Sequence, residues 1–366
     1  MGRPIKAFVL YSLFLFNKWK VSCTYRRFIK NMLGKQSVEK HPLTGAEKRE
    51  VKKYWGQLKY SDVRWHQYFK NEFGFDKKFV PTDLFYYLIE PVLNPRNYAL
   101  LIQNKGLYNF FFPYFKQPES LIKNIDGLFY DQSMNLMSLD KAVKLLLEYD
   151  KRFVIKPTVD SARGDGVLLV KHRDKDLILD LLCKYRKNFI IQEVVSQSKE
   201  MSFFNSNSLN TIRVMTLFLN GKVSVLNSFI RFGLGNSCVD NLCAGGCAVN
   251  VCPDGTLRVY GIKSDSSRVF QTESGVFFKD IQLSFYADLV EKVCEMHRRM
   301  PLCALISWDI AVNSKGEYVM IEVNLTAQPS YYNQFMSGFP LFKERTDEVI
   351  QYVKNHGVGN VVLKSN

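Results

Sequence analysis

Two carboxylates and an amide at the end of a predicted hairpin are the residues of this sequence with the clearest chemistry. Residues 307–324 consist of two apolar runs around Asn-Ser-Lys-Gly-Glu, a turn-rich insert, and this pattern predicts a β-hairpin. Because side chains alternate along a strand, Glu322 and Asn324 point to the same face. Asp309 joins them if the loop is 313–316, or only 315–316, whereas a loop of odd length turns it away.

Asp309, Glu322 and Asn324 are therefore candidate metal ligands. Carboxylate and amide oxygens suit Mg²⁺, which completes its shell with water and with substrate phosphates. The alternative is that these are polar residues at strand ends that face solvent. An acidic face in a chain of net charge +15 favours the metal site.

A second candidate site is a glycine-containing hairpin over residues 152–170. Lys156-Pro157 ends an apolar strand, and the following polar loop contains Ser161, Gly164 and Gly166. Glycine has no Cβ, so such a loop can bring backbone N–H groups onto phosphate oxygens. It is not a Walker loop, because Lys156 precedes the glycines and no Gly-Lys-Ser/Thr follows. A plain hairpin with a surface lysine is the alternative.

Further polar residues lie inside or at the end of apolar strands. Gln192 and Glu193 end a predicted buried strand over 188–195, where exposed backbone groups could pair with an adenine edge. Glu200 follows seven residues after Glu193, within reach of a ribose hydroxyl. Arg213 and Arg231 lie within predicted strands, and since an unpaired buried charge is costly, each must face an acid or a phosphate.

The elements that position these residues follow from periodicity and turn signals. The N-terminal region to residue 97 is predicted to be helical, and an aromatic loop over 326–342 is expected to border an acceptor pocket. Asn220-Gly221 predicts a hairpin turn between two strands. The other predicted elements are strands at 98–103, 209–219, 221–230 and 248–251, and helices at 139–149, 174–185, 283–300 and 346–354.

Composition limits the classes of partner. A chain of 366 residues with 46% hydrophobic content can bury a core in two or three lobes. The net charge of +15 indicates anionic partners, but without a long Lys/Arg run we expect no nucleic-acid binding. A cluster of three cysteines, Cys243, Cys247 and Cys252, makes a metal or iron–sulfur site a possibility to consider. Their spacing, however, matches no zinc-binding or ferredoxin motif. Reduced, buried thiols in a cytosolic chain are the favoured interpretation.

The N-terminal apolar segment leaves two interpretations open. Residues 7–16 are apolar, but ten residues cannot span a bilayer. Basic residues flank them, and no small-residue cleavage site follows, which disfavours a cleaved signal peptide. The segment is either a helix packed into the core or a basic amphipathic segment that touches the inner membrane surface.

Five motifs occur in an order that resembles the ATP-grasp superfamily. They are Asn-Lys at 104–105, Val-Ile-Lys-Pro at 154–157 with its glycine loop, Gln-Glu-Val-Val at 192–195, Asn-Thr-Ile-Arg at 210–213, and Asp-x12-Glu-x-Asn at 309–324. A more specific resemblance is to the sugar-transfer-associated ATP-grasp family of bacterial surface-polysaccharide clusters. It rests on residues 208–216, residues 231–246 and the hairpin. The resemblance covers about residues 48–351.

The resemblance implies roles for these residues. Lys105 and Lys156 would contact the phosphates of ATP under a lid that contains Ser161, Gly164 and Gly166. The adenine hinge would be Gln192, Glu193 and Val195, with Glu200 on the ribose. Asp309, Glu322 and Asn324 would hold Mg²⁺, with Glu322 bridging two ions. The sequence departs from the pattern at Asn104, where an aspartate is usual, and at Ser307, where many relatives have an arginine, so Arg213 or Arg231 would serve the γ-phosphate.

The resemblance also implies a fold and an activity. The fold would be α+β, with a small lid lobe at 98–195 and an antiparallel-sheet catalytic lobe at 196–366 that clamp ATP, after an α-rich region at 1–97. The chain would be a cytoplasmic, Mg²⁺-dependent carboxylate–amine ligase that joins an amino acid or amino sugar to a uronic acid through an acyl phosphate. The acidic sugar would be a small molecule or lipid-linked, with peripheral contact at the inner membrane left open. The alternatives are a sugar phosphotransferase and a non-catalytic nucleotide-binding scaffold.

Overall fold

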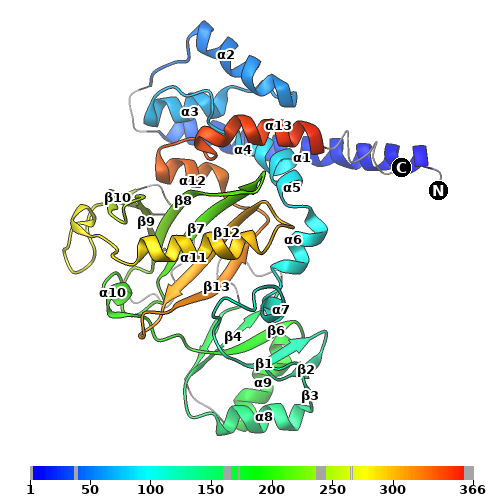
Figure 1. Ribbon diagram of the computed structural model, residues 1–366, viewed down its shortest axis with the longest axis vertical. Helices are drawn as coiled ribbons and strands as arrows, with labels where there is room; N and C mark the ends of the chain where they lie inside the picture. The colour runs from blue at the N-terminus through cyan, green and yellow to red at the C-terminus, as the bar shows by residue number, and fades with distance from the viewer. Residues whose placement is uncertain are drawn as a thin grey trace. The chain divides into compact units, whose positions relative to one another are not determined.

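The chain divides into two compact units, each treated by itself. The computed structural model describes residues 3–36, 40–159, 166–171, 174–235, 245–263, 265 and 267–357. A helical unit comprises Met1–Tyr98, Leu302–Leu305 and Leu325–Asn366, and a two-sheet unit comprises Ala99–Pro301 and Ile306–Asn324 (Figure 1). Residues from 325 onward, which the sequence assigned to the catalytic lobe, therefore group with the N-terminal helices.

An aromatic core holds the helical unit together. Phe69 stacks on Phe79 with ring centroids 4.4 Å apart, and the fully buried Trp65 packs beside Phe69. The carboxylate of Glu90 accepts the backbone N–H groups of Ala327 and Gln328, at 2.9 and 2.8 Å, and so anchors the chain that follows residue 324. The helices are α1 (Arg3–Lys35), α2 (Gly45–Trp55), η1 (Gly56–Leu58), α3 (Arg64–Phe73), α4 (Thr82–Leu84), the π-helical η2 (Phe85–Ile89), α5 (Glu90–Leu93), α12 (Ser330–Ser337), η6 (Lys343–Arg345) and α13 (Thr346–His356).

Two sequence predictions are wrong in this part of the chain. The predicted strand at 98–103 belongs to helix α6 (Arg96–Ile102), because its alanine and leucines form helices well and a short apolar run does not distinguish the two structures. The predicted loop at 326–342 contains α12. One buried face of α12 is polar: the amide of Gln334 bonds the backbone N–H and C=O of Val80, at 2.7 and 3.0 Å, so apolar spacing does not reveal the helix.

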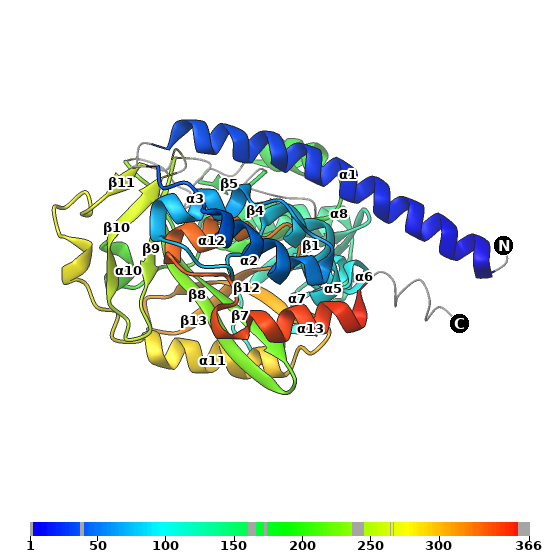
Figure 2. The ribbon, with the colours of Figure 1, turned by 90° about the horizontal axis from the view of Figure 1, so that it is seen from above.

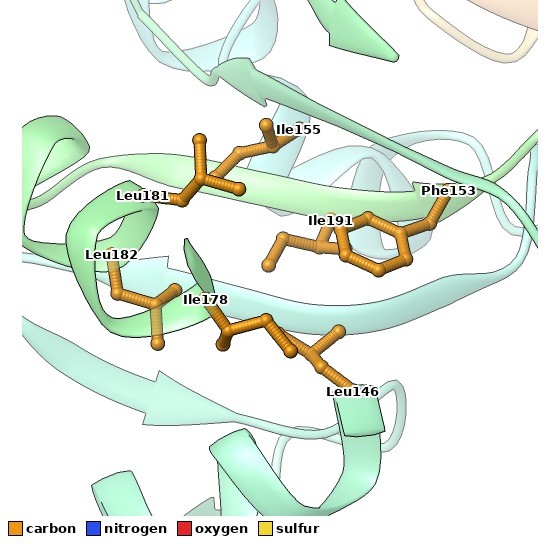
Figure 3. A pocket seen from close by; sticks show the side chains of 7 residues that line it. All are labelled: Leu146, Phe153, Ile155, Ile178, Leu181, Leu182 and Ile191. Carbon is orange, nitrogen blue, oxygen red and sulfur yellow. The ribbon is translucent and has the colours of Figure 1, made fainter. Parts of the chain in front are cut away.

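The first sheet of the two-sheet unit has the order β3-β2-β1-β6-β4-β5. Helices α8 (Leu139–Glu148) and α9 (Lys175–Tyr185) cover one face of this sheet, and seven apolar side chains surround a small gap beneath them (Figure 3). Since every side chain around the gap is apolar, we interpret it as core packing. The strands are β1 (Ser120–Ile125), β2 (Leu128–Tyr130), β3 (Leu136–Met137), β4 (Phe153–Pro157), β5 (Leu168–Val170) and β6 (Phe189–Glu193); η3 (Lys105–Leu107) and α7 (Tyr108–Phe111) precede them.

The second sheet has the order β11-β10-β9-β8-β7-β12-β13, and α11 (Tyr286–Arg298) packs on β7 and β8. The predicted turn is confirmed: Asn220 and Gly221 both have positive φ, 50° and 74°, and join β7 to β8 in antiparallel register. The elements are α10 (Lys199–Ser202), β7 (Thr211–Leu219), β8 (Lys222–Phe232), β9 (Cys247–Val251), β10 (Leu257–Lys263), β11 (Arg268–Val269), η5 (Phe278–Asp280), β12 (Leu305–Val312) and β13 (Tyr318–Asn324).

The β12–β13 hairpin reaches the predicted register by an unexpected route. Val312 pairs with Tyr318, so five residues connect the strands, and this odd number alone would turn Asp309 away from Glu322. A register shift between Asp309 and Ile310 adds one residue to β13, and Asp309 then pairs with Glu322. The bulge restores the shared face that the candidate site requires.

Candidate functional site

A row of four charged side chains crosses four adjacent strands of the second sheet. Arg231 on β8 pairs with Thr211 on β7, and Arg213 lies two residues along β7 on the same face. Asp309 on β12 and Glu322 on β13 continue the row, in the strand order β8-β7-β12-β13 (Figure 1). Helix α11 packs on the opposite face of β8, where Tyr286 donates to Ser228 at 2.7 Å, so it does not cover the charged row.

Two arginines neutralise Asp309 in the interior. Asp309 is 1% exposed, and Arg213 binds it with two bonds, Nε–Oδ1 at 2.6 Å and NH2–Oδ2 at 2.5 Å. NH2 of Arg231 lies 3.2 Å from Oδ2. Burial raises the pKa of the Asp309 carboxyl, but the two guanidinium groups more than offset it, so the pKa lies below its ordinary value. Asp309 is thus an ionised carboxylate held by a bidentate pair.

Two lysines from the first sheet and its entry helix complete the charged site. Nζ of Lys105, in η3, lies 2.8 Å from Oε1 of Glu322. Lys156, on β4, is buried, and desolvation together with the charge of Lys105 lowers its pKa to about 8, although Glu322 opposes this. Two cations close to one carboxylate leave positive charge in excess, which suits a polyanion such as a phosphate chain.

We expect the depressed pKa of Lys156 to appear as a pH-dependent stability. The unfolded chain holds the Lys156 proton to about pH 10.4, whereas the folded chain releases it near pH 8. Between these values the unfolded state binds more protons, so this residue makes the folded state more stable as pH rises. We propose to measure the melting temperatures of wild type and Lys156→Met from pH 7 to 9.5 without nucleotide. The melting temperature of wild type should rise relative to that of the variant as pH increases. A difference in melting temperature that does not change with pH would contradict the lowered pKa of Lys156.

The oxygen ligands proposed for a metal lie side by side. Nδ2 of Asn324 donates to Oδ2 of Asp309 at 3.3 Å, and Glu322 pairs with Asp309 across the strands. Hard oxygen donors fit Mg²⁺, which would take its other ligands from phosphate and water. Each carboxylate now bonds a cation, so binding of Mg²⁺ would compete with Arg213 and Lys105. Within the described ranges no group of three or more His, Cys, Asp or Glu residues is placed to hold a metal.

The cysteine alternative gains no support from the residues that can be described. Cys247 and Cys252 are free thiols, and burial raises the pKa of Cys247 to about 12. Cys243 lies outside the described residues. A protonated, buried thiol is a poor metal ligand.

The predicted adenine hinge lies at the end of β6. Gln192 is buried, and its amide donates to the carbonyl oxygen of Pro118 at 3.2 Å. Glu193 is the last residue of β6 and Val195 follows it in the loop. Glu200 lies in the first turn of α10, which is tied to β12 because the N–H of Ser198 donates to the carbonyl oxygen of Val312 at 2.8 Å. These side chains lie in the two-sheet unit with the charged row, but their contact with a nucleotide remains a prediction.

The predicted lid is described only at its C-terminal end. Ser161 and Gly164 lie outside the described residues. Gly166 has φ +72°, and a Cβ there would lie 2.9 Å from Cγ of Pro157. The Tyr185 hydroxyl also donates to the Gly166 carbonyl oxygen at 2.6 Å. Both φ and close packing therefore require glycine where the loop rejoins β5.

We expect Gly166→Ala to destabilise the β4–β5 hairpin by about 1–3 kcal/mol, because alanine meets both a disfavoured φ and the Pro157 ring. Gly127→Ala is the matched control: its φ is +92°, but nothing lies within 4 Å of the added Cβ. Melting temperatures of the two variants separate crowding from backbone strain. Equal losses would show that the contact with Pro157 is unimportant.

The structure adds polar residues that the sequence did not single out. The buried Tyr108 hydroxyl accepts the backbone N–H of Val323 at 3.1 Å and thereby links α7 to β13 between Glu322 and Asn324. Lys123 and Lys156 flank Ile190 on neighbouring strands, so they share a face; Lys123 donates to Oδ1 of Asn109 at 2.7 Å. Asn250 pairs with Phe229 on the charged face. In the sequence, Lys123 and Asn250 could have been noticed as polar residues within otherwise apolar strands.

The match to a family model identifies the chain, whose fold is of the α+β class, as an ATP-grasp protein. The model of the family described as sugar-transfer associated ATP-grasp matches residues 88–349, and the chain belongs to this family. No curated protein matches the chain.

Solved structures give distant likenesses. The ADP complex of N5-carboxyaminoimidazole ribonucleotide synthetase is 15% identical, with a TM-score of 0.36 and coverage of 62% of this chain and 46% of that one. D-alanyl-alanine synthetase A from Vibrio cholerae is 12% identical (TM-score 0.41, 69% and 65%), and L-amino acid ligase from Bacillus licheniformis is 12% identical (TM-score 0.38, 74% and 49%). The matched part spans less than two thirds of each of these proteins.

Proposed function

We propose that this chain is an ATP-dependent ligase that activates a carboxylate as an acyl phosphate and transfers the acyl group to an amine. The observation that carries this proposal is the charged row together with the two lysines beside it. Lys105 bonds Glu322 and Arg213 bonds Asp309, and Lys156 is buried close by. Four cations around two carboxylates can hold a triphosphate together with its metal ion. They can also balance the charge of a second anion, the carboxylate to be activated.

The reaction has two steps. A carboxylate oxygen attacks the γ-phosphorus, the bond from this phosphorus to the β–γ bridging oxygen breaks, and ADP leaves. The amine nitrogen then attacks the acyl carbon, the bond from this carbon to the phosphate oxygen breaks, and the nitrogen loses a proton to solvent. Lys105 and Lys156 would hold the phosphates, while Arg213 and Arg231 would orient the transferred group and balance its charge.

Asp309, Glu322 and Asn324 would hold Mg²⁺, which, when bound, neutralises phosphate charge and orients the reacting group. Gln192, Glu193 and Val195 would bind the adenine, with Glu200 at the ribose. Among this chain's own residues, Arg213 has a second task, because it keeps Asp309 ionised and aligned.

The family description and the excess of positive charge support an acidic sugar as the carboxylate substrate. A uronic acid, free or lipid-linked, would be joined to an amino acid or amino sugar for a bacterial surface polysaccharide. We propose a cytoplasmic location, where ATP and sugar precursors occur together.

Incubation of the full chain with ATP, Mg²⁺ and pooled uronic acids and amines tests this proposal. ADP release together with a new amide, detected by mass spectrometry, is the expected result. A stable phosphorylated sugar would instead identify a phosphotransferase. Measurable ATP binding with no ADP release in any pool would favour a scaffold.

A further inference from the structure

Helix α1 separates apolar and basic residues along its length. Its 33 residues include eight Lys or Arg residues and no Asp or Glu. Residues 7–16 carry no charge, whereas six of the eight cations lie between Lys18 and Lys35. The helix is therefore apolar near its start and strongly basic afterwards.

The basic half of α1 is the part that packs on the helical unit. Tyr25 stacks on Tyr86 with centroids 5.0 Å apart, and Phe28 contacts Trp65 and Tyr331. Ile29 is buried there. These contacts fix the second half of α1 and leave its cations at positions 20, 26, 27 and 30 exposed.

The apolar half of α1 extends beyond this packing (Figure 2). Phe8, Leu13, Phe16 and Trp19 are 72%, 59%, 61% and 63% exposed, and Val9, Tyr11 and Leu15 are also exposed. Phe14 contacts Tyr87, but its neighbours face solvent on several sides of the helix. The sequence interpretation as a core helix is therefore wrong for this half. Such a continuous apolar surface marks an interaction site.

We propose that the first half of α1 inserts into one leaflet of an anionic lipid bilayer, with the following cations at the headgroups. Ten residues of helix are about 15 Å long, close to half of a hydrocarbon core of about 30 Å. No helix within the described ranges is long and apolar enough to cross a membrane, so insertion stops within one leaflet. Trp19 lies where the apolar half meets the basic half, and tryptophan is favoured at the membrane interface.

Charge distinguishes a lipid surface from a second copy of this chain. Two α1 helices in contact would each bring eight cations and no anion, so they would repel one another. An anionic headgroup layer instead attracts every one of these cations. This inference does not depend on the proposed ligase activity.

Flotation of the full chain with vesicles tests the proposal. The chain should float with vesicles of phosphatidylglycerol and phosphatidylcholine, and not with phosphatidylcholine alone. Leu13→Asp/Phe16→Asp should weaken this binding at least about tenfold. The matched control, Leu101→Asp/Phe339→Asp, changes residues that are 51% and 60% exposed elsewhere and should bind like wild type.

A second pair of variants tests the cations. Lys20→Gln/Arg27→Gln should weaken binding to the anionic vesicles about fivefold for each charge removed, whereas Lys151→Gln/Arg152→Gln removes two exposed cations elsewhere and should have no such effect. Light scattering of the free protein gives its oligomeric state. Failure of wild type to float, equal losses in test and control variants, or a dimer that Leu13→Asp/Phe16→Asp dissociates without loss of flotation would overturn the proposal.

Discussion

Glu322→Gln is expected to reduce ATP turnover by roughly 10²–10³-fold or more while the protein stays folded. Glutamine keeps the shape of the side chain and an oxygen for Lys105, whose Nζ lies 2.8 Å from Oε1 of Glu322. It removes the negative charge that a divalent cation needs and leaves two lysines without their counter-charge. We therefore expect calorimetry to show loss of the Mg²⁺-dependent part of nucleotide binding, and ADP release to fall in parallel.

Glu317→Gln on the same hairpin is the matched control. Glu317 is exposed and pairs with Lys116, away from the charged row, so the substitution should leave turnover and nucleotide binding unchanged. The melting temperature of Glu317→Gln should lie close to that of wild type, because its ion pair is exposed. Glu322→Gln should melt at a lower temperature but stay folded, because the buried Lys105 loses its carboxylate partner. Wild-type ADP release by Glu322→Gln would show that Glu322 is not a metal ligand.

The sequence predicted the hairpin and the turn at Asn220-Gly221 because both rest on local rules. Alternation places Glu322 and Asn324 on one face, and two adjacent residues with positive φ require Asn-Gly or a similar pair. The partners of Asp309 could not be predicted in this way. Arg213 and Asp309 lie 96 residues apart, and only the strand order β8-β7-β12-β13 brings the two arginines to this carboxylate.

Other errors came from rules that were applied too simply. The number of residues in the loop did not determine which residue pairs with Asp309. A bulge between Asp309 and Ile310 adds one residue to β13, and nothing in the sequence predicts it. The helix at 330–337 was missed because Asn333 and Gln334 are buried and satisfied by hydrogen bonds. The departure at Ser307 has a structural counterpart: Arg213, from the neighbouring strand, supplies a guanidinium beside Asp309.

Arg213→Ala is expected to cost about 3 kcal/mol of stability at neutral pH, because it leaves a carboxylate that is 1% exposed with one guanidinium, that of Arg231, in place of two. Arg299→Ala is the matched control, since Arg299 forms an exposed pair with Glu295 at 2.7 Å and its loss should cost less than about 1 kcal/mol. Arg213→Met/Asp309→Leu should recover part of the lost stability, because the buried carboxylate is removed, although Arg231 then loses this ion pair; turnover should not recover.

The stability loss in Arg213→Ala should depend on pH. In wild type the pKa of Asp309 is depressed, so its stabilising contribution is present above the unfolded pKa of about 3.9 and is lost only as pH falls through the lower folded value. In the variant, burial acts against one remaining guanidinium, and the pKa of Asp309 rises. A carboxyl with a raised pKa is tolerated when protonated and destabilises the fold as pH increases. The difference in melting temperature between wild type and Arg213→Ala should therefore shrink from pH 7.5 to pH 5, and a difference that grows toward acid pH would contradict the buried ion pair.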